Sequence, residues 1–173
     1  MAKRRVALTG LGTVNPLAHD VPAFWQALRE GRSGIRRIQR FDPAPFASQI
    51  GGEVQDWAGV PPELLDPRES KRMDRFSQFA VAAALEAVAD SGLDFEREDR
   101  QRCGVVIGTG IGGLQELETQ HERMLQRGPG RVSPFTVPKL MGNAASGTIA
   151  IQWGLRGANF ACVTACASAA NAI

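Results

Sequence analysis

The chain has 173 residues, of which 43% are apolar, and its formal net charge at neutral pH is +2. This length can make one domain with a substantial core. The balanced charge and the lack of an arginine-rich arm argue against nucleic acid as a partner. No run of about 18 apolar residues is present, so we expect no membrane span. Three cysteines without disulfide spacing fit a reducing compartment, and we therefore expect a cytoplasmic protein.

The first third of the chain predicts few regular elements. An apolar run over Arg4–Thr9 predicts a buried first strand that ends at glycines. Asp20 can cap a helix over Val21–Glu30, whose apolar face carries Phe24, Leu28 and Trp25. The range Gly31–Pro67 is rich in glycine and proline, and we interpret it as irregular with one short strand near Ile50–Val54.

The rest of the chain alternates between helical and strand patterns. Apolar residues recur at helical spacing from Glu69 to Ser91, and Gly92 is placed to end that helix. The elements expected after it are a strand at Cys103–Thr109, helices at Leu114–Gln126 and Pro138–Trp153, and a strand at Asn159–Val163. This alternation predicts an α/β fold with a mixed, mostly parallel sheet and helices on both faces.

Cys166 is the strongest candidate for chemistry. It follows the strand predicted at Asn159–Val163 and precedes a run of small, helix-compatible residues. At such a turn the unpaired N–H groups of a helix favour thiolate over thiol, and the thiolate is the nucleophile. The pattern suits covalent acyl transfer, although local sequence alone leaves a small buried hydrophobe as an equal alternative.

The glycines from Gly108 to Gly113 match G-x-G-x-x-G after a strand, which is the fingerprint of dinucleotide binding. An acidic residue on a second strand should follow about 20 residues later, but a loop at Gly128–Pro134 occupies that place. A steric role, in which backbone passes close to a core or pocket, therefore fits better. A dinucleotide-binding domain stays a minor alternative.

No pattern indicates a metal site. Cys162 and Cys166 form C-x3-C, but His19 and His121 lie far away in polar contexts. We expect both histidines to be solvated, and Cys103 and Cys162 to be inert core thiols.

Four basic residues share helical spacing at the start of the long predicted helix: Arg68, Lys71, Arg72 and Arg75. Such a stripe is usually a solvated helix face, and nearby acidic residues dilute it. Docking of an acidic partner is the functional alternative.

Together these motifs resemble the beta-ketoacyl-[acyl-carrier-protein] synthase II family of condensing enzymes. The matching stretches begin with Arg5–Gly12, Phe24-Trp25, Gly31–Ile35 and Arg72–Phe76, and continue with Asp90–Leu93, Gly108–Gly113, Ser133–Phe135 and Thr164–Cys166. They span almost the whole chain in order, which makes Cys166 the residue that we expect to be the nucleophile.

The resemblance implies the thiolase fold, in which two similar α/β halves of one chain surround a five-layered core, and it implies that two such chains form a homodimer. Residues 1–173 would be an incomplete N-terminal ketosynthase domain that ends just after the nucleophile. The family's two histidines for malonyl binding and decarboxylation, a nearby lysine and a gating phenylalanine loop belong to the second half and map to no residue here. We therefore expect the 173-residue chain alone to be inactive.

The implied reaction is a decarboxylating Claisen condensation. Cys166 accepts a fatty acyl group from acyl carrier protein, and the carbanion of decarboxylated malonyl-carrier protein attacks the resulting thioester. The backbone N–H of Cys166 supplies half of the oxyanion hole. No cofactor is expected on this chain, because the carrier protein brings the phosphopantetheine.

The resemblance also assigns roles around the nucleophile. Ile111 aligns with a residue that lines the acyl tunnel, for which ordinary core packing is the alternative. Phe135 and Thr136 approach the acyl pocket across the dimer interface, and Thr136 replaces a second aromatic residue of the family. Because the carrier protein is acidic in this family, the basic stripe and Arg127 and Arg131 become candidates for docking it.

Two further departures from the family pattern are Gly157-Ala158-Asn159, where a proline is usual, and Ala169-Ala170-Asn171, where a sequence ending in histidine is usual. Both leave room for the ketosynthase of a polyketide system. A non-catalytic thiolase-fold assembly subunit is the alternative from another class, but such subunits typically lack the cysteine.

Overall fold

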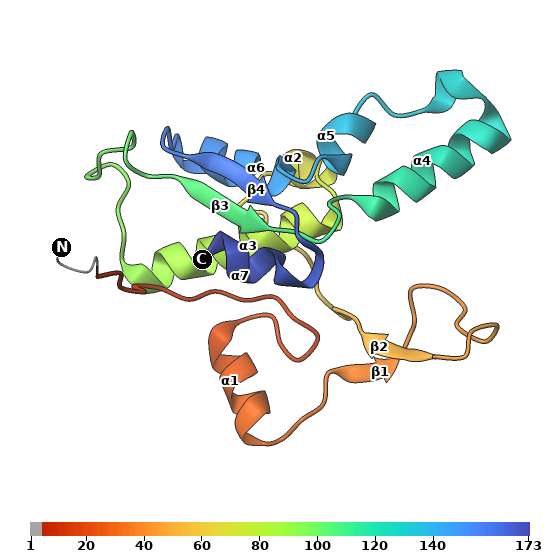
Figure 1. Cartoon of the computed structure of the whole chain (residues 1–173), viewed down its shortest axis with the longest axis horizontal. Helices are drawn as coiled ribbons and strands as arrows, with labels where there is room; N and C mark the ends of the chain where they lie inside the picture. Colours follow the sequence, from red (N-terminus) through yellow and green to blue (C-terminus); the bar gives the residue numbers. More distant parts are fainter. Residues whose placement is uncertain (1–4) are drawn as a thin grey trace. The chain divides into compact units, whose positions relative to one another are not determined.

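The computed structural model describes residues 5–173, which divide into two compact units. The first unit contains residues up to Gly59 together with Ala82–Leu93, and the second contains Val60–Val81 and Asp94–Ile173. Helix α3 (Arg75–Ser91) contributes its first part to the second unit and its remainder to the first. Figure 1 traces the elements along the chain.

The first unit contains a short helix and a small hairpin. Helix α1 (Val21–Arg29) begins as predicted, because the Asp20 carboxylate accepts the Ala23 N–H at 2.7 Å and Pro22 lies in the first turn. Its apolar face is not buried, since Trp25 is 61% exposed and only Ala27 is covered. Strands β1 (Ile35–Arg37) and β2 (Ile50–Gly52) pair antiparallel.

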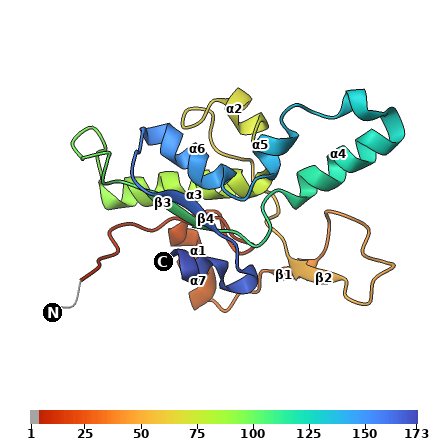
Figure 2. The ribbon, with the colours of Figure 1, turned by 45° about the horizontal axis from the view of Figure 1, so that its top comes forward.

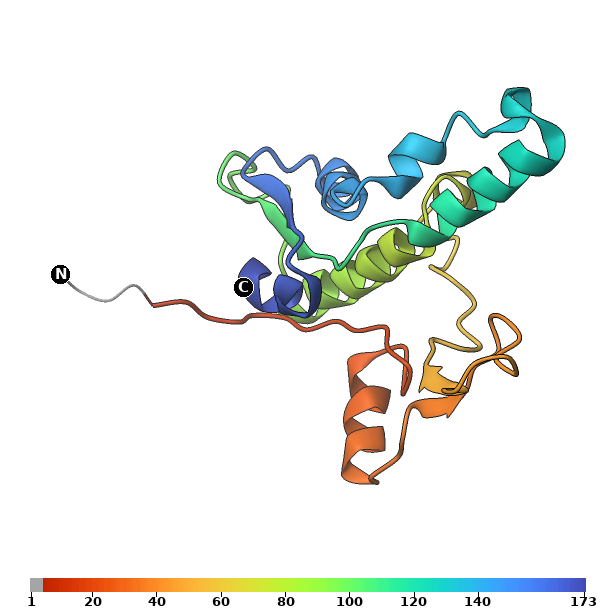
Figure 3. The same cartoon turned by 45° about the vertical axis from the view of Figure 1, so that its right-hand side comes forward.

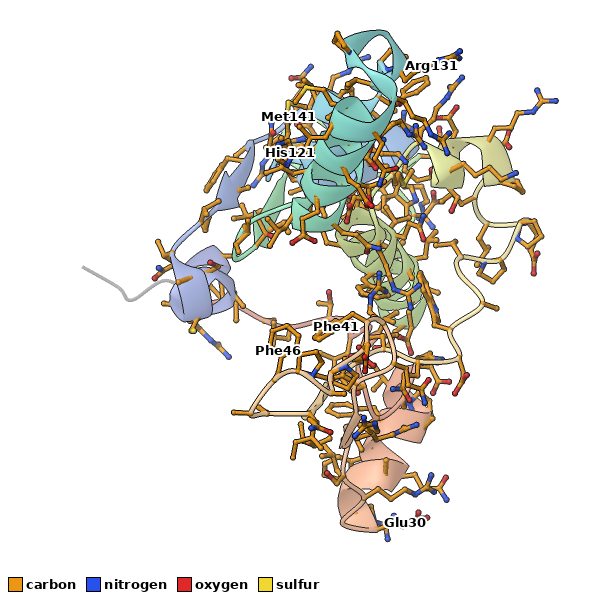
Figure 4. All side chains as sticks on the ribbon, turned by 90° about the vertical axis from the view of Figure 1, so that its right-hand side faces the viewer. Glu30, Phe41, Phe46, His121, Arg131 and Met141 are labelled. Atoms are coloured by element: carbon orange, nitrogen blue, oxygen red, sulfur yellow. The ribbon has the colours of Figure 1, made fainter. Side chains whose placement is uncertain are left out.

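Sequence reasoning missed β1 and predicted β2 two residues too long. The loop between the two strands carries an edge-to-face contact of Phe41 with Phe46 (Figure 4). The Glu53 carboxylate closes this loop by accepting the N–H groups of Gln39 and Arg40. A hydrogen bond from the Gln55 side chain, followed by the one from Gln39, lowers the pKa of Glu53.

The strand predicted at Arg4–Thr9 is not formed. Arg4 lies outside the described residues, and residues 5–15 form neither helix nor strand, with Val6 92% exposed. A strand requires a hydrogen-bonded neighbour, and among the described residues none pairs with this segment. The segment instead lies along the second part of α3, whose Glu86 accepts the N–H groups of Thr13 and Val21.

Glycine lets that segment lie against α3. A Cβ atom on Gly12 would lie 1.9 Å from the carbonyl oxygen of Ala83, so no other residue fits there. The second part of α3 is rich in alanine, and the segment therefore approaches its backbone closely.

The long helix predicted over Glu69–Ser91 is two helices, α2 (Pro67–Lys71) and α3. The break follows from Asp74, whose carboxylate accepts the Phe76 N–H and whose carbonyl accepts the N–H groups of Ser77 and Gln78. An aspartate used in this way starts a new helix. Gly92 ends α3 with a φ of +65°, as predicted.

The second unit is built on two parallel strands, β3 (Val105–Gly108) and β4 (Asn159–Cys162), in a register that pairs Val105 with Asn159. Helix α6 (Ala144–Trp153) packs on one face of the pair and α7 (Ser168–Ala172) on the other (Figure 2). The apolar core of the unit consists of Val60, Leu65, Val81, Val105, Ala145, Ile149 and Ala150. The parallel pair with helices on both faces agrees with the predicted fold class.

A helical arm leaves β3 and returns to α6 (Figure 3). It consists of α4 (Leu114–Arg127), the short 3-10 helix η1 (Pro129–Arg131) and α5 (Thr136–Leu140). Lys139 on α5 lies 3.5 Å from Glu116 on α4, and the Gln120 side chain accepts the Ser133 N–H, so the two helices are tied together. The helix predicted over Pro138–Trp153 is thus divided between α5 and α6. No helix within residues 5–173 is long and apolar enough to cross a membrane.

Candidate active site

Two loops meet at the carboxyl ends of β3 and β4. Because the strands are parallel and Gly108 pairs with Cys162, residues 109–113 and 163–167 leave the sheet side by side. The Gly142 position links them, since a Cβ atom there would touch both Thr109 and Val163. Ligands of open α/β sheets bind at this end of the strands.

Cys166 lies in the second of these loops, on the 3-10 helix η2 (Ala165–Ala167) that leads directly into α7. Its side chain is exposed. The backbone N–H of Cys166 has no hydrogen-bond partner within residues 5–173. The structure therefore presents both an accessible sulfur and an unused amide donor at the place where the sequence predicts the nucleophile.

Two of the three motif glycines have the steric role that the sequence favoured: Gly108 and Gly113 lie directly against backbone, whereas a Cβ atom on Gly110 would meet nothing within 4 Å. Gly108 ends β3 directly against the first turn of α7, and no side chain fits between them. Gly112 has a φ of +87° and approaches the carbonyl oxygen of Leu140 at the end of α5. Gly108, Gly112 and Gly113 serve contacts between backbone segments.

The other two thiols are half-buried. Cys162 ends β4 and directs its sulfur toward the carbonyl oxygen of Asn171, 3.5 Å away. Cys103 precedes β3 instead of lying within it. Within residues 5–173 no three His, Cys, Asp or Glu side chains are grouped as a metal site would require.

The three residues predicted to line the acyl pocket lie in two separate segments, Ile111 in the loop after β3 and Phe135 and Thr136 at the start of α5. Ile111 is 65% exposed. Phe135 lies beside an apolar groove of about 410 Å³, and Thr136 begins α5. Ile111 does not line this groove, so the structure does not bring Ile111 and Phe135 into one cavity within the chain.

The groove runs between the start of α3 and helices α5 and α6. Its walls are mostly apolar, with Met73, Pro138, Met141 and Ile151 among them. Ser77 lies in its lining, is 1% exposed and has no hydrogen-bond partner for its hydroxyl.

The predicted basic stripe is not one helix face, because the helix breaks after Lys71. Arg72 lies beyond the break, forms an ion pair with Glu69 at 2.7 Å and covers the ring of Phe135. Arg75 begins α3 and covers the ring of Phe79. Arg68 and Lys71 remain together on α2.

A second basic cluster was only partly predicted. Arg123, Arg127 and Arg131 line an open hollow at the far end of the helical arm, where Figure 4 labels Arg131. No described carboxylate forms an ion pair with any of the three. Arg123 was missed, although its spacing of four residues from Arg127 places both on one helix face.

The comparison with known families shows to which family the chain belongs. Residues 3–173 match the sequence profile described as "Beta-ketoacyl synthase, N-terminal domain". The chain belongs to the beta-ketoacyl synthase family. This agrees with the resemblance drawn from the motifs, and it excludes a dinucleotide-binding domain as the identity of the chain.

A curated relative from Synechocystis, 3-oxoacyl-[acyl-carrier-protein] synthase 2, is 46% identical over 100% of this chain. The chain spans 41% of the length of that relative. The structure of a beta-ketoacyl synthase from Burkholderia phymatum is 25% identical, with a TM-score of 0.79 over 98% of this chain and 41% of its own. The predicted thiolase-like fold, present in part, is thereby confirmed.

A second similar structure comprises a type II polyketide ketosynthase in complex with its acyl-carrier protein. It is 21% identical, with a TM-score of 0.75, and the match covers 98% of this chain and 44% of the other. At this identity the likeness concerns the fold of the synthase alone.

Proposed function

We propose that this beta-ketoacyl synthase chain carries the nucleophile of a 3-oxoacyl-[acyl-carrier-protein] synthase that elongates fatty acids, and that Cys166 is this nucleophile. The observation that carries the proposal is the pairing of an exposed Cys166 side chain with an unused Cys166 N–H at the carboxyl ends of β3 and β4. An accessible thiol beside a free amide donor is what acyl transfer from a thioester needs.

In the first step the Cys166 thiolate attacks the carbonyl carbon of an acyl thioester on the carrier protein. A bond forms between Sγ and that carbon, the bond to the pantetheine sulfur breaks, and the departing thiolate takes up a proton. Negative charge develops on the carbonyl oxygen between these events. The Cys166 N–H can donate to that oxygen, and one such donor is typically worth about 3 kcal/mol in the transition state.

In the second step malonyl-carrier protein loses carbon dioxide. The electron pair of the broken carbon–carbon bond attacks the acyl carbon held on Cys166, and Sγ leaves as thiolate. The new carbon–carbon bond lengthens the chain and regenerates the nucleophile. The groups that promote decarboxylation are not assigned to any residue of this chain.

The acyl chain would extend past the loop after β3. Ile111 is the residue of that loop with an exposed apolar side chain. We infer that its size sets which acyl lengths fit, and that Phe135 and Thr136 contribute through a second copy of the chain. We also propose that the protein is a homodimer and that it is cytoplasmic. Residues 1–173 are proposed to be an incomplete N-terminal ketosynthase domain.

The partner that brings the acyl group is an acidic carrier protein. Arg123, Arg127 and Arg131 form an arginine hollow without carboxylate partners, which gives a positive surface for acidic side chains. Arg68 and Lys71 on α2 offer a second positive surface. Arg72 and Arg75 are less available, because both cover aromatic rings and Arg72 is paired with Glu69.

The experiment is a condensation assay on the protein as its gene encodes it. With an acyl-carrier protein thioester and malonyl-carrier protein, the wild type should form the 3-oxoacyl product, seen by mass spectrometry, and Cys166→Ala should form none. Retained condensation by Cys166→Ala would overturn the assignment. Repeated extension that depends on a different partner subunit would indicate a polyketide ketosynthase instead.

A further inference from the structure

Thr164, two residues before Cys166, is held by the segment that follows the cysteine. Its N–H donates to the Ser168 hydroxyl at 2.9 Å, and its carbonyl oxygen accepts the Ala167 N–H at 3.1 Å. Its own hydroxyl accepts a hydrogen bond from the Asn171 side chain at 2.7 Å. Cys166 therefore lies in a loop that is closed by hydrogen bonds between Thr164, which precedes it, and residues that follow it.

Ala165, directly before the cysteine, has a φ of +50°. Residues with a Cβ atom avoid this left-handed region, because the Cβ atom comes too close to the following carbonyl oxygen. Such a conformation persists only where the surroundings enforce it.

One hydroxyl connects both sides of this strained residue. Ser168 Oγ accepts from the Thr164 N–H and donates to the carbonyl oxygen of Ala165 at 2.7 Å. Ser168 is 3% exposed, and its backbone is backed by the end of β3 at Gly108. The Ser168 side chain is therefore fixed on the sheet, while Thr164, Ala165 and Cys166 are exposed.

We propose that Ser168 is a positioning residue for the nucleophile: its buried hydroxyl holds the left-handed turn at Ala165 and so sets the direction of the Cys166 thiol and amide. The inference rests on Cys166 as the nucleophile of the proposed function. Without the hydroxyl, the Thr164 N–H and the Ala165 carbonyl oxygen lose their shared partner. The turn can then relax toward ordinary φ values, which changes the direction of the Cys166 N–H and of its side chain.

The test compares four proteins at full length: wild type, Ser168→Ala, Ser168→Thr and the double variant Ala165→Gly/Ser168→Ala. Ser168→Thr keeps the hydroxyl. The double variant lacks it, but glycine adopts a positive φ without steric cost. Two rates are measured for each: acylation of Cys166 by acyl-carrier protein, resolved into kcat and KM, and alkylation of Cys166 by iodoacetamide as a function of pH.

We expect Ser168→Ala to lower the kcat of acylation by about 10- to 100-fold, with KM little changed, because the reacting groups are misplaced. Ser168→Thr should restore most of the rate, and the double variant should recover part of it. The pH profile of alkylation should also change in Ser168→Ala and return toward wild type in the rescued proteins. A merely structural role would lower thermal stability and leave that profile unchanged.

If Cys166 is acylated and alkylated in Ser168→Ala at wild-type rates, the proposal for Ser168 is overturned, while Cys166 remains the nucleophile. If Ser168→Ala does not fold, a folded Ala165→Gly/Ser168→Ala variant that is acylated no faster than the Cys166→Ala variant of the condensation assay would overturn the proposal as well. Failure of the wild type to acylate at all counts against the proposed function. In that case the alkylation profiles still decide whether Ser168 orients the thiol.

Discussion

Gly108 lies directly against Ser168: a Cβ atom on Gly108 would lie 2.4 Å from both the carbonyl carbon and the carbonyl oxygen of Ser168. The contact joins the end of β3 to the first residue of α7, only two residues after Cys166. The sheet therefore supports the turn of the proposed nucleophile through backbone contact, without any side chain between them.

Gly108→Ala should disrupt this support. The added methyl group meets backbone, which cannot rotate away, so we expect a loss of about 1–3 kcal/mol in the free energy of unfolding. Gly110→Ala is the matched control, since a Cβ atom there meets nothing within 4 Å. Urea denaturation of both variants checks this, and equal stability of the two would contradict the packing described.

Gly147→Ala should have the opposite effect. Gly147 lies within α6, and a Cβ atom there has no neighbour within 4 Å. Alanine in place of a helical glycine should stabilise the protein by about 0.5–1 kcal/mol. A rise in Tm measured by calorimetry tests this, and a fall would show that the groove beside Gly147 is filled by another part of the protein.

The arginine hollow predicts that the affinity for an acidic carrier protein depends on salt concentration. Removing one guanidinium, as in Arg127→Ala, should weaken binding of an acidic carrier protein about 2- to 5-fold at low ionic strength, the range of single exposed charge pairs. The loss should shrink as salt is added, because exposed charges are screened. Fluorescence anisotropy of labelled carrier protein measures it. Arg97→Ala, an exposed arginine elsewhere in the second unit, serves as the control, and an equal loss there would argue against a specific surface.

Glu53 predicts an acid-sensitive loop between β1 and β2. Hydrogen bonds from Gln55 and Gln39 lower its pKa below the ordinary value of 4.5, so the ionised form is favoured in the folded state. Its stabilising effect is complete above the unfolded pKa and is lost as the pH falls through the lower folded pKa. The Gln39 amide shift in NMR should titrate with a midpoint below 4.5 and lose this titration in Glu53→Ala. A midpoint above 4.5 would contradict the contacts.

The sequence predicted correctly those helix ends that depend on a few neighbouring residues. Asp20 and Pro22 specify the start of α1, and Gly92 specifies the end of α3, because capping and positive φ depend on a few neighbouring residues. The parallel strands β3 and β4 also followed from their short apolar runs.

Elements that depend on distant partners were predicted poorly. The apolar pattern from Arg4 to Thr9 fits a strand, but pairing requires a neighbour that the pattern does not contain. Asp74 is one of the acidic residues near the predicted basic stripe, and helical spacing alone does not show that its carboxylate starts a new helix. β1 has three exposed residues and therefore no alternation to detect.

At the candidate site the sequence located Cys166, but it did not find Ser168 or Arg123. Ser168 appeared as one small residue among many at the start of a helix. Its importance depends on the left-handed turn at Ala165, for which an alanine gives no signal. Arg123 was masked by the acidic and polar residues around it on α4.

The central claim is that Cys166 carries the acyl group, and its most direct measurement is the site of acylation. The protein as its gene encodes it is incubated with a fatty acyl-carrier protein, digested, and analysed by peptide mass spectrometry. The account predicts an acyl mass on the peptide that contains Cys166, sensitive to hydroxylamine, present in Cys103→Ala and absent in Cys166→Ala. An acyl group found on Cys103 or Cys162, or retained in Cys166→Ala, would contradict it.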